Sequence, residues 1–327
     1  MLRKVAGKLG LAHHFLAPDR GSPAVLMYHG VLADEGGRPA VGDHKHTGES
    51  LFREHLRLLA RRRRVVPLST LVQTLLRKGD SRGMVAITFD DGYLNNAECA
   101  ARVLREYSMS AAFFLATGFI GADRWAWTDR LEYVVESAPE QQATVRFDGE
   151  PGGSARVRIT SAAERSALMN RVKAELKNLD WRLAEERVAE LAATLGVHQA
   201  VPTGKYRFMS WDQARGLVKD GFEVGAHTVN HAILARVPLD SAEQEILGSQ
   251  AHIRAETGTC CPTFCYPNGK AADFSPGVMD ICRAHFDAAL SAIRGAARVE
   301  DRYEIRRIGV GHETSTGWLA AGLLREQ

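Results

Sequence analysis

The chain has 327 residues, of which 45% are hydrophobic and 25% are charged, and its formal net charge is only +3. This is an ordinary soluble globular composition, and the length lies above the usual single-domain size but within reach of an α/β barrel. Basic residues are dispersed except for the run at 61–64, which closes a predicted amphipathic helix at its carbonyl end, so we expect no nucleic-acid partner.

Cysteine usage gives no sign of a disulfide framework. The five cysteines are an odd number in a long chain, and Cys260 and Cys261 are adjacent. Cys261 and Cys265 lack a second ligand pair, so we do not expect a structural zinc site. This usage fits a reducing compartment.

The residues before the first predicted strand form an N-terminal extension, 1–22. Its apolar residues are interrupted by Gly, Lys and His, so we find no signal-peptide core, and nowhere a run of eighteen or more apolar residues. We therefore expect a cytoplasmic protein without a transmembrane segment. The weakly basic, amphipathic start could touch an anionic membrane surface, and a frayed terminal helix is the alternative.

Apolar runs alternate with helical patterns along most of the chain. Uninterrupted apolar strands that alternate with helices indicate parallel βα units, and hence an α/β fold. The predicted strands lie at 24–28, 65–68, 84–87, 111–116, 222–226, 263–266, 287–290 and 304–310. The predicted helices between them include 95–107, 211–219, 239–257 and 275–284.

Residues 122–205 break this rhythm. They contain a predicted helix at 131–137, a possible hairpin around 149–153 and a long, charged helical stretch at 162–195. We predict a mainly helical insertion on one loop of the barrel. Trp125 and Trp127 could stack on sugar rings, or they could pack the insertion onto the barrel.

Two adjacent carboxylates, Asp90 and Asp91, follow the strand at 84–87, and Gly92 then allows a sharp turn. Ligands bind at such strand ends in α/β folds because the loops there converge on one crevice. Side chains alternate along an extended segment, so we expect one carboxylate to hold a metal while the other faces a water or a substrate. A strand that ends in a polar turn is the alternative.

Two histidines, His227 and His231, follow the strand at 222–226 with a spacing of four residues. We expect them at the same barrel face as the aspartates. Two imidazoles and one carboxylate leave an open coordination position, as in catalytic zinc sites, and the same set accepts iron, cobalt or nickel. The spare carboxylate can then act as a general base. His29, just past the first strand, could also line this site, or it could be a core histidine.

Three segments together resemble the signature motifs of one family, the polysaccharide deacetylases (the NodB-homology group, or carbohydrate esterase family 4). They are Thr88-Phe89-Asp90-Asp91-Gly92, His227-Thr228-Val229-Asn230-His231 and a Tyr-Pro-x-Gly version of the third motif, Phe264-Cys265-Tyr266-Pro267-Asn268-Gly269. The resemblance covers roughly 23–120 and 205–312. It implies a distorted (β/α)7 barrel over 23–327, with the insertion at 122–205, that removes acetyl groups, mostly N-acetyl, from sugars.

The resemblance also implies a role for each matching residue. Asp90 is the base, and Asp91, His227 and His231 hold one divalent ion, with zinc the first expectation. A backbone N–H of the loop 266–269 could stabilise the oxyanion. The residues expected to bind the substrate are Tyr266, Pro267, Asn268, Gly269 and Arg307.

The chain departs from the family pattern in two places. Cys265 stands where many members have an arginine that orients the catalytic aspartate, and Arg307, on the last predicted strand, could reach Asp90 from another side. The general-acid histidine of the family has no clean match. His312 is the best candidate for it, and an ordinary exposed histidine is the alternative.

The sequence thus predicts a metal-dependent deacetylase that acts on a sugar of a polysaccharide or of a glycan precursor. Two alternatives stay open: a catalytically silent carbohydrate-binding relative, for which the replaced arginine is the reason, and an amidohydrolase acting on a non-sugar amide. The absence of an export signal favours a precursor made inside the cell. The sequence does not reveal the oligomeric state.

Overall fold

The structure, a computed structural model, describes residues 21–34, 45–298 and 302–325. All but two residues of the expected N-terminal extension lie outside this part of the chain, together with their expected membrane contact. Within the described residues, no helix combines the length and the apolar character that crossing a bilayer requires.

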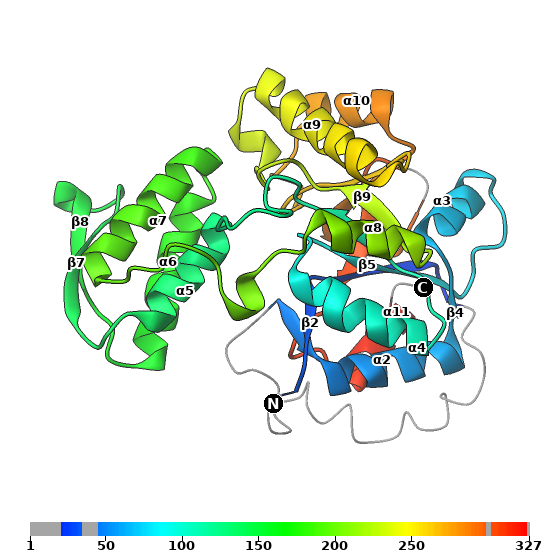
Figure 1. Cartoon of the computed structure of the whole chain (residues 1–327), viewed down its shortest axis with the longest axis horizontal. Helices are drawn as coiled ribbons and strands as arrows, with labels where there is room; N and C mark the ends of the chain where they lie inside the picture. The colour runs from blue at the N-terminus through cyan, green and yellow to red at the C-terminus, as the bar shows by residue number, and fades with distance from the viewer. Residues whose placement is uncertain (1–20, 35–44, 299–301, 326–327) are drawn as a thin grey trace.

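Seven parallel strands close into a barrel (Figure 1). Around the ring they follow the order β1, β12, β11, β10, β9, β6, β5, and β5 pairs back with β1 from Ala24 opposite Val85 to Tyr28 opposite Phe89. This confirms the expected α/β fold. The strands are β1 (Ala24–Tyr28), β5 (Met84–Phe89), β6 (Ala112–Leu115), β9 (Glu223–Ala226), β10 (Thr263–Cys265), β11 (Ala288–Arg294) and β12 (Ile305–Gly309). Outside the ring, β2 (Gly30–Leu32) pairs with β3 (His46–Gly48).

The barrel strands are apolar without interruption because both of their faces are buried. Along β5, Ala86 belongs to the cluster that fills the barrel, whereas Ile87 and Phe89 belong to the larger cluster between the barrel and its helices. Alternation along the strand therefore carries Thr88 and then Asp90 into the barrel. The polar site thus begins where the apolar filling ends.

Helices cover the outside of the ring (Figure 1). They are α2 (Glu49–Arg62), α3 (Leu68–Leu76), α4 (Ala101–Glu106), α8 (Trp211–Lys219), α9 (Leu239–Thr257), α10 (Pro276–His285) and α11 (Thr316–Arg325). A π-helical turn at Asn96–Ala100 precedes α4.

The predicted strand at 65–68 is wrong in its extent. Strand β4 covers only Arg64–Val65, beside the start of β5, and α3 begins at Leu68. The reason is a tertiary contact, since the Glu223 carboxylate on β9 accepts hydrogen bonds from the backbone N–H groups of Leu68 (2.7 Å) and Ser69 (3.1 Å). A carboxylate at a helix N-terminus satisfies N–H groups that would otherwise lack acceptors.

The insertion occupies the chain between β6 and α8 and lies to one side of the barrel (Figure 1). It contains α5 (Trp127–Ser137), the antiparallel hairpin of β7 (Gln142–Arg146) and β8 (Ser154–Arg158), α6 (Ala162–Leu176) and α7 (Trp181–Leu195). These elements bury an apolar cluster of their own. The helical stretch predicted at 162–195 is two helices, because Asp180 caps α7 by accepting a hydrogen bond from the backbone N–H of Arg182.

The two tryptophans at the start of the insertion are structural. Trp125 and Trp127 are each only 6% exposed. Trp127 belongs to the apolar cluster of the insertion, and Trp125 packs on Tyr133 and Tyr206, with ring centroids 5.2 and 5.6 Å apart. Of the two roles considered for these tryptophans, the structure favours packing over sugar stacking.

Candidate metal centre and active site

The first motif is a tight turn at the end of β5. Asp91 and Gly92 have left-handed backbone conformations, with φ values of 75° and 87°. A Cβ at Gly92 would lie 2.8 Å from Ile120 Cδ1, so only glycine fits there. Alternation along β5 directs Asp90 into the barrel, and the left-handed turn that begins at Asp91 directs the second carboxylate to other partners.

The structure brings the three expected metal ligands together. The Nε2 atoms of His231 and His227 lie 3.2 and 3.4 Å from the same oxygen of Asp91, Oδ1. The ligand atoms of all three residues lie within 4.8 Å of one another. This Asp-His-His group can therefore hold one metal ion.

Two further observations fit a cation at this place. The Oδ1 atom of Asp91 is buried and makes no hydrogen bond to a described residue. His227 donates a hydrogen bond from Nδ1 to the carbonyl oxygen of Cys265 (2.7 Å), which leaves its Nε2 unprotonated in the neutral ring and turned toward Asp91. Burial opposes the charged form of Asp91, but His231 and His227 outweigh it and hold the pKa of this carboxyl well below its usual value. Asp91 can thus offer a negatively charged oxygen to a cation.

A buried glutamate holds the histidine loop in shape. Glu245 on α9 accepts hydrogen bonds from the backbone N–H of Val229 (3.0 Å), from that of Asn230 (2.7 Å) and from the Asn230 side chain (2.6 Å). Thr228 and His231 have left-handed backbones, with φ values of 62° and 53°. Such conformations cost free energy and persist where the surroundings impose them, as these bonds do.

The other aspartate is held by an arginine from the opposite end of the chain. Arg307 on β12 donates to both oxygens of Asp90, at 2.8 and 2.7 Å, and also to Thr88 Oγ1 at 3.1 Å and to the Ser291 carbonyl at 2.8 Å. Cys265 Sγ lies 3.0 Å from the same guanidinium. Burial opposes ionisation of Asp90, but Arg307 outweighs burial and lowers the pKa of Asp90.

This contact corrects one expectation about Arg307 and agrees with another. Arg307 reaches Asp90 from β12 and not from the third motif, as the sequence suggested. However, Arg307 is only 1% exposed, so it does not contact the substrate as we expected of it. Its place is behind the carboxylate.

Most of the third-motif loop is also buried. Tyr266 is 1% exposed and donates its hydroxyl to the Tyr303 carbonyl (3.0 Å), which excludes the expected substrate contact of its side chain. Pro267 and Gly269 are buried, whereas Asn268 is half-buried. The N–H groups of Tyr266 and Gly269 donate within the chain. That of Asn268 has no acceptor among the described residues.

His29 and His312, the other histidines that the sequence suggested for the site, lie in different surroundings. His29 is half-buried, and burial lowers its pKa although Asp91 and Asp90 are near enough to oppose that shift. His312 lies beyond the end of β12 and is within 3.7 Å of the exposed Glu313. The role of His312 as general acid stays a prediction.

Side chains of the insertion bond to all three motif loops, which the sequence did not indicate. Each bond is made by a different insertion residue, and each meets a residue within a motif or directly after it. The three bonds join Asp129 to Tyr93 (2.8 Å), Arg124 to Asn230 (2.6 Å) and Lys177 to Asn268 (2.5 Å).

Sequence reasoning missed these insertion residues and Glu245. A charged residue on an amphipathic helix is usually solvated, so Asp129 and Glu245 carried no signal of their own. The closest signal was the asparagine within each of two motifs, Asn230 and Asn268, because a short amide there can bond to a neighbouring element.

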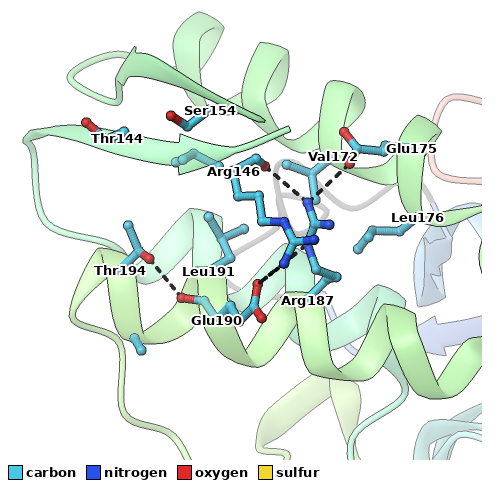
Figure 2. A pocket seen from close by; sticks show the side chains of 12 residues that line it. Thr144, Arg146, Ser154, Val172, Glu175, Leu176, Arg187, Glu190, Leu191 and Thr194 are labelled. Atoms are coloured by element: carbon cyan, nitrogen blue, oxygen red, sulfur yellow. Dashed lines mark hydrogen bonds and ion pairs between the residues drawn. The ribbon is translucent and has the colours of Figure 1, made fainter. Parts of the chain in front are cut away.

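A cavity of about 430 Å³ lies elsewhere, between the β7–β8 hairpin and helices α6 and α7 (Figure 2). Its main charged group, Arg187, is paired with Asp148 at 2.8 Å and with Glu175 at 3.2 Å. Because this cation already has carboxylate partners, the cavity offers no free charge to a ligand, and we do not count it as part of the site.

Comparisons with known proteins agree with this geometry. The sequence profile of the family described as "Polysaccharide deacetylase" matches residues 77–148 and 172–279, more than half of the chain. No protein with a curated description matches the sequence.

Several solved structures share the fold over nearly the whole chain. The deacetylase PplD of Streptococcus pyogenes, solved in complex with acetate, superposes with a TM-score of 0.60 at 14% identity, over 92% of this chain and 98% of that one. IcaB from Ammonifex degensii gives 0.58 at 17% identity, over 94% and 98%. A de-N-acetylase from Aggregatibacter actinomycetemcomitans gives 0.57 at 15% identity, over 92% and 99%.

Proposed function

The chain belongs to the polysaccharide deacetylase family, and from this premise we propose that it is a metal-dependent hydrolase that removes acetyl groups, most of all N-acetyl groups, from a sugar. The observation that carries the proposal is the pair of neighbouring carboxylates with different surroundings. Asp91 faces two histidines, and Asp90 faces one arginine. Two carboxylates whose surroundings differ in this way can take different roles in one reaction.

Asp90 is the proposed general base. The two bonds from Arg307 fix the orientation of its carboxylate and keep it ionised, so it is ready to accept the proton of an attacking water. A divalent ion held by Asp91, His227 and His231 would supply Lewis-acid stabilisation of the acetyl carbonyl and would lower the pKa of a water. The ligand set suits zinc and also cobalt, nickel or iron.

The reaction also needs a hydrogen-bond donor for the oxyanion and a proton donor for the leaving amine. The backbone N–H of Asn268, which has no acceptor among the described residues, can donate to the oxyanion that forms from the acetyl group. The leaving amine needs a proton, and His29 and His312 are the candidates for supplying it. Asp91 and Asp90 both act on the pKa of His29, but burial outweighs them and favours its neutral form.

The experiment that tests the proposal measures acetate release by the purified full-length protein. The panel pairs N-acetylglucosamine oligosaccharides with O-acetylated sugars and with a non-sugar N-acetyl amide. We expect acetate from the N-acetylated sugars, loss of activity on chelation and recovery with zinc or cobalt. Asp90→Asn should bind the metal but release little acetate. If the metal-loaded protein releases no acetate from any sugar, or only from the non-sugar amide, the proposal is wrong.

A further inference from the structure

Two lysines one turn apart lie at the C-terminal end of α6: Lys173 in its last turn and Lys177 directly after it. Residues four apart lie on the same face of a helix, and both lysines are half-buried. Lys177 donates to Asn268 Oδ1 at 2.5 Å, so this face looks onto the third-motif loop. Arg236 adds a third cation here, with its Nε 3.4 Å from the carbonyl oxygen of Lys177.

Lys45 connects the insertion to the residue that follows the first motif. The Lys45 ammonium bonds to the Asp129 carboxylate and lies 3.1 Å from the Tyr93 hydroxyl, directly after the first motif. Burial lowers the pKa of Lys45, but Asp129 and then Asp91 raise it above its usual value. The Asp91 carboxylate thus also acts electrostatically on Lys45.

Lys173 itself pairs with no carboxylate in the part of the chain that the structure describes. Its ammonium makes no hydrogen bond or ion pair with any residue that the structure describes. Burial, together with the ammonium groups of Lys45 and Lys177, lowers the pKa of Lys173 to about 8, and Glu132 and Asp129 offset this shift only in part. The pKa of a lysine whose ammonium extends into water would not shift in response to these neighbouring charges.

The carboxylates of this region are bonded to other groups. Glu132 accepts from Lys205 at 2.7 Å and from the Tyr206 hydroxyl at 3.1 Å. On the other side, Asp273 accepts from the Asn268 side chain at 2.7 Å and from the backbone N–H of Lys270 at 2.9 Å. Asp273 keeps its negative charge because both of its donors are neutral, but Lys173, Lys177 and Arg236 outnumber it. Among the described residues, the surface between α6 and the motif loops therefore has a net positive charge.

We propose that Lys173 and Lys177 bind an anionic group of the substrate, a phosphate or a carboxylate, carried next to the acetylated sugar. This inference rests on the proposed function and narrows its substrate class to negatively charged glycans and glycosyl phosphates. The insertion then contributes directly to substrate recognition, because α6 brings the cations to the loop that faces the reacting group. A phosphate or carboxylate between two ammonium groups gains charge-assisted hydrogen bonds and relieves the repulsion between them.

The test compares three sugars that differ only in charge: N-acetylglucosamine, its 1-phosphate, and the corresponding 6-carboxylate, a 2-acetamido uronic acid. Binding is measured by calorimetry on zinc-loaded Asp90→Asn protein, and acetate release on the wild type. We expect at least one charged sugar to bind tenfold more tightly than the neutral one. The phosphate and carboxylate arms identify which anion the site prefers.

Variants separate recognition from structure. Lys173→Gln should remove most of the preference for the charged sugar, both in affinity and in kcat/KM, and Lys173→Arg should restore the preference. Lys219→Gln, at an exposed lysine near the end of α8, is the matched control and should change neither value. Direct binding of phosphate to the metal alone would keep the preference in Lys173→Gln and would overturn the inference.

The inference and the proposed function fail in different ways. Metal-dependent acetate release from neutral sugars, with equal affinity for neutral and charged ones, overturns only the inference. A charge preference that depends on Lys173, without acetate release from any sugar, upholds the anion site and overturns the deacetylase function.

Discussion

Arg307 and Asp90 are 217 residues apart in the chain and form a two-bond ion pair inside the barrel, at 2.8 and 2.7 Å. Their strands, β12 and β5, are both neighbours of β1 in the ring. The small side chain of Cys265, 3.0 Å from the guanidinium, leaves the room that Arg307 occupies. The aspartate thus keeps an arginine partner although the third-motif position is a cysteine.

Replacing Arg307 should move the pH dependence of the reaction. Arg307 holds the pKa of Asp90 below its usual value, so Arg307→Gln should raise that pKa, and the acidic limb of kcat/KM should shift to higher pH. Removing one partner of a buried ion pair typically also costs about 3–5 kcal/mol of stability. As a control, Arg306→Gln replaces the exposed neighbouring arginine and should leave both the pH profile and the Tm unchanged. An unshifted acidic limb in folded Arg307→Gln would show that this arginine does not tune the base.

Moving the arginine from position 307 to the third-motif position 265 also tests the pairing with Asp90. If only one guanidinium is needed behind Asp90, the double variant Cys265→Arg, Arg307→Ser should recover part of the activity that Arg307→Ser loses. Full-length protein and the same sugar serve for both variants. A double variant that folds but is no more active than Arg307→Ser would mean that the approach from β12 is essential.

The two neighbouring aspartates should respond differently to the same substitution. Asp90→Asn removes basicity and keeps shape, so the metal should stay bound while kcat falls by about 10²–10⁴-fold, the usual cost of losing a general base. Asp91→Asn removes an anionic ligand, so metal content and activity should fall together. Elemental analysis of the purified variants, beside acetate release, distinguishes the two cases. Near-native turnover in metal-loaded Asp90→Asn would move the base elsewhere, to His29 first.

Glu245 should matter to metal binding without touching the metal. Its three bonds hold the backbone between His227 and His231, so Glu245→Ala should weaken metal affinity by about 10–100-fold, as with other residues that orient ligands. Competition with a chromogenic chelator measures this affinity. Glu243→Ala, two residues earlier on the exposed side of α9, is the control and should bind metal normally. Unchanged affinity in Glu245→Ala would show that the loop keeps its shape unaided.

Trp127→Ala should act on stability and not on catalysis. The side chain is buried in the apolar cluster of the insertion, and replacing a buried tryptophan by alanine typically costs about 3–5 kcal/mol. We expect a clear fall in Tm with KM changed by less than twofold. A large rise in KM with little loss of Tm would revive the sugar-stacking role.

Lys173→Met should stabilise the protein at neutral pH. The pKa of Lys173 is about 8 in the folded protein and has its ordinary value of 10.5 when unfolded, so the unfolded chain binds the proton more tightly. The charged lysine therefore costs stability below pH 8, and that cost shrinks as pH rises from 8 to 10.5. Tm should rise by a few degrees at pH 7, since about 1 kcal/mol moves Tm by roughly 2–4 °C at this size, and the gain should be smaller at pH 10. Equal Tm values at pH 7 would show that Lys173 is solvated.

The sequence by itself determined the parallel barrel and the three residues that can hold a metal. Strands buried on both faces must be apolar throughout, which made most of them visible, and the chemistry of Asp91, His227 and His231 is local to short motifs at strand ends. Strand ends converge in such a fold, so the meeting of these motifs followed from topology. The extent of β4 did not follow, because Glu223, from a distant strand, sets the start of α3.

Only the tertiary structure decided what surrounds the motifs. The partner of Asp90, the loop support from Glu245 and the contacts of the insertion all join residues far apart in the chain, and a single charged residue on a helix or strand looks the same whether it is solvated or paired. For the same reason, the sequence did not reveal that Tyr266 and Arg307 are buried. A motif names the residue types that a reaction needs, but which side chains point to the substrate depends on how neighbouring elements pack.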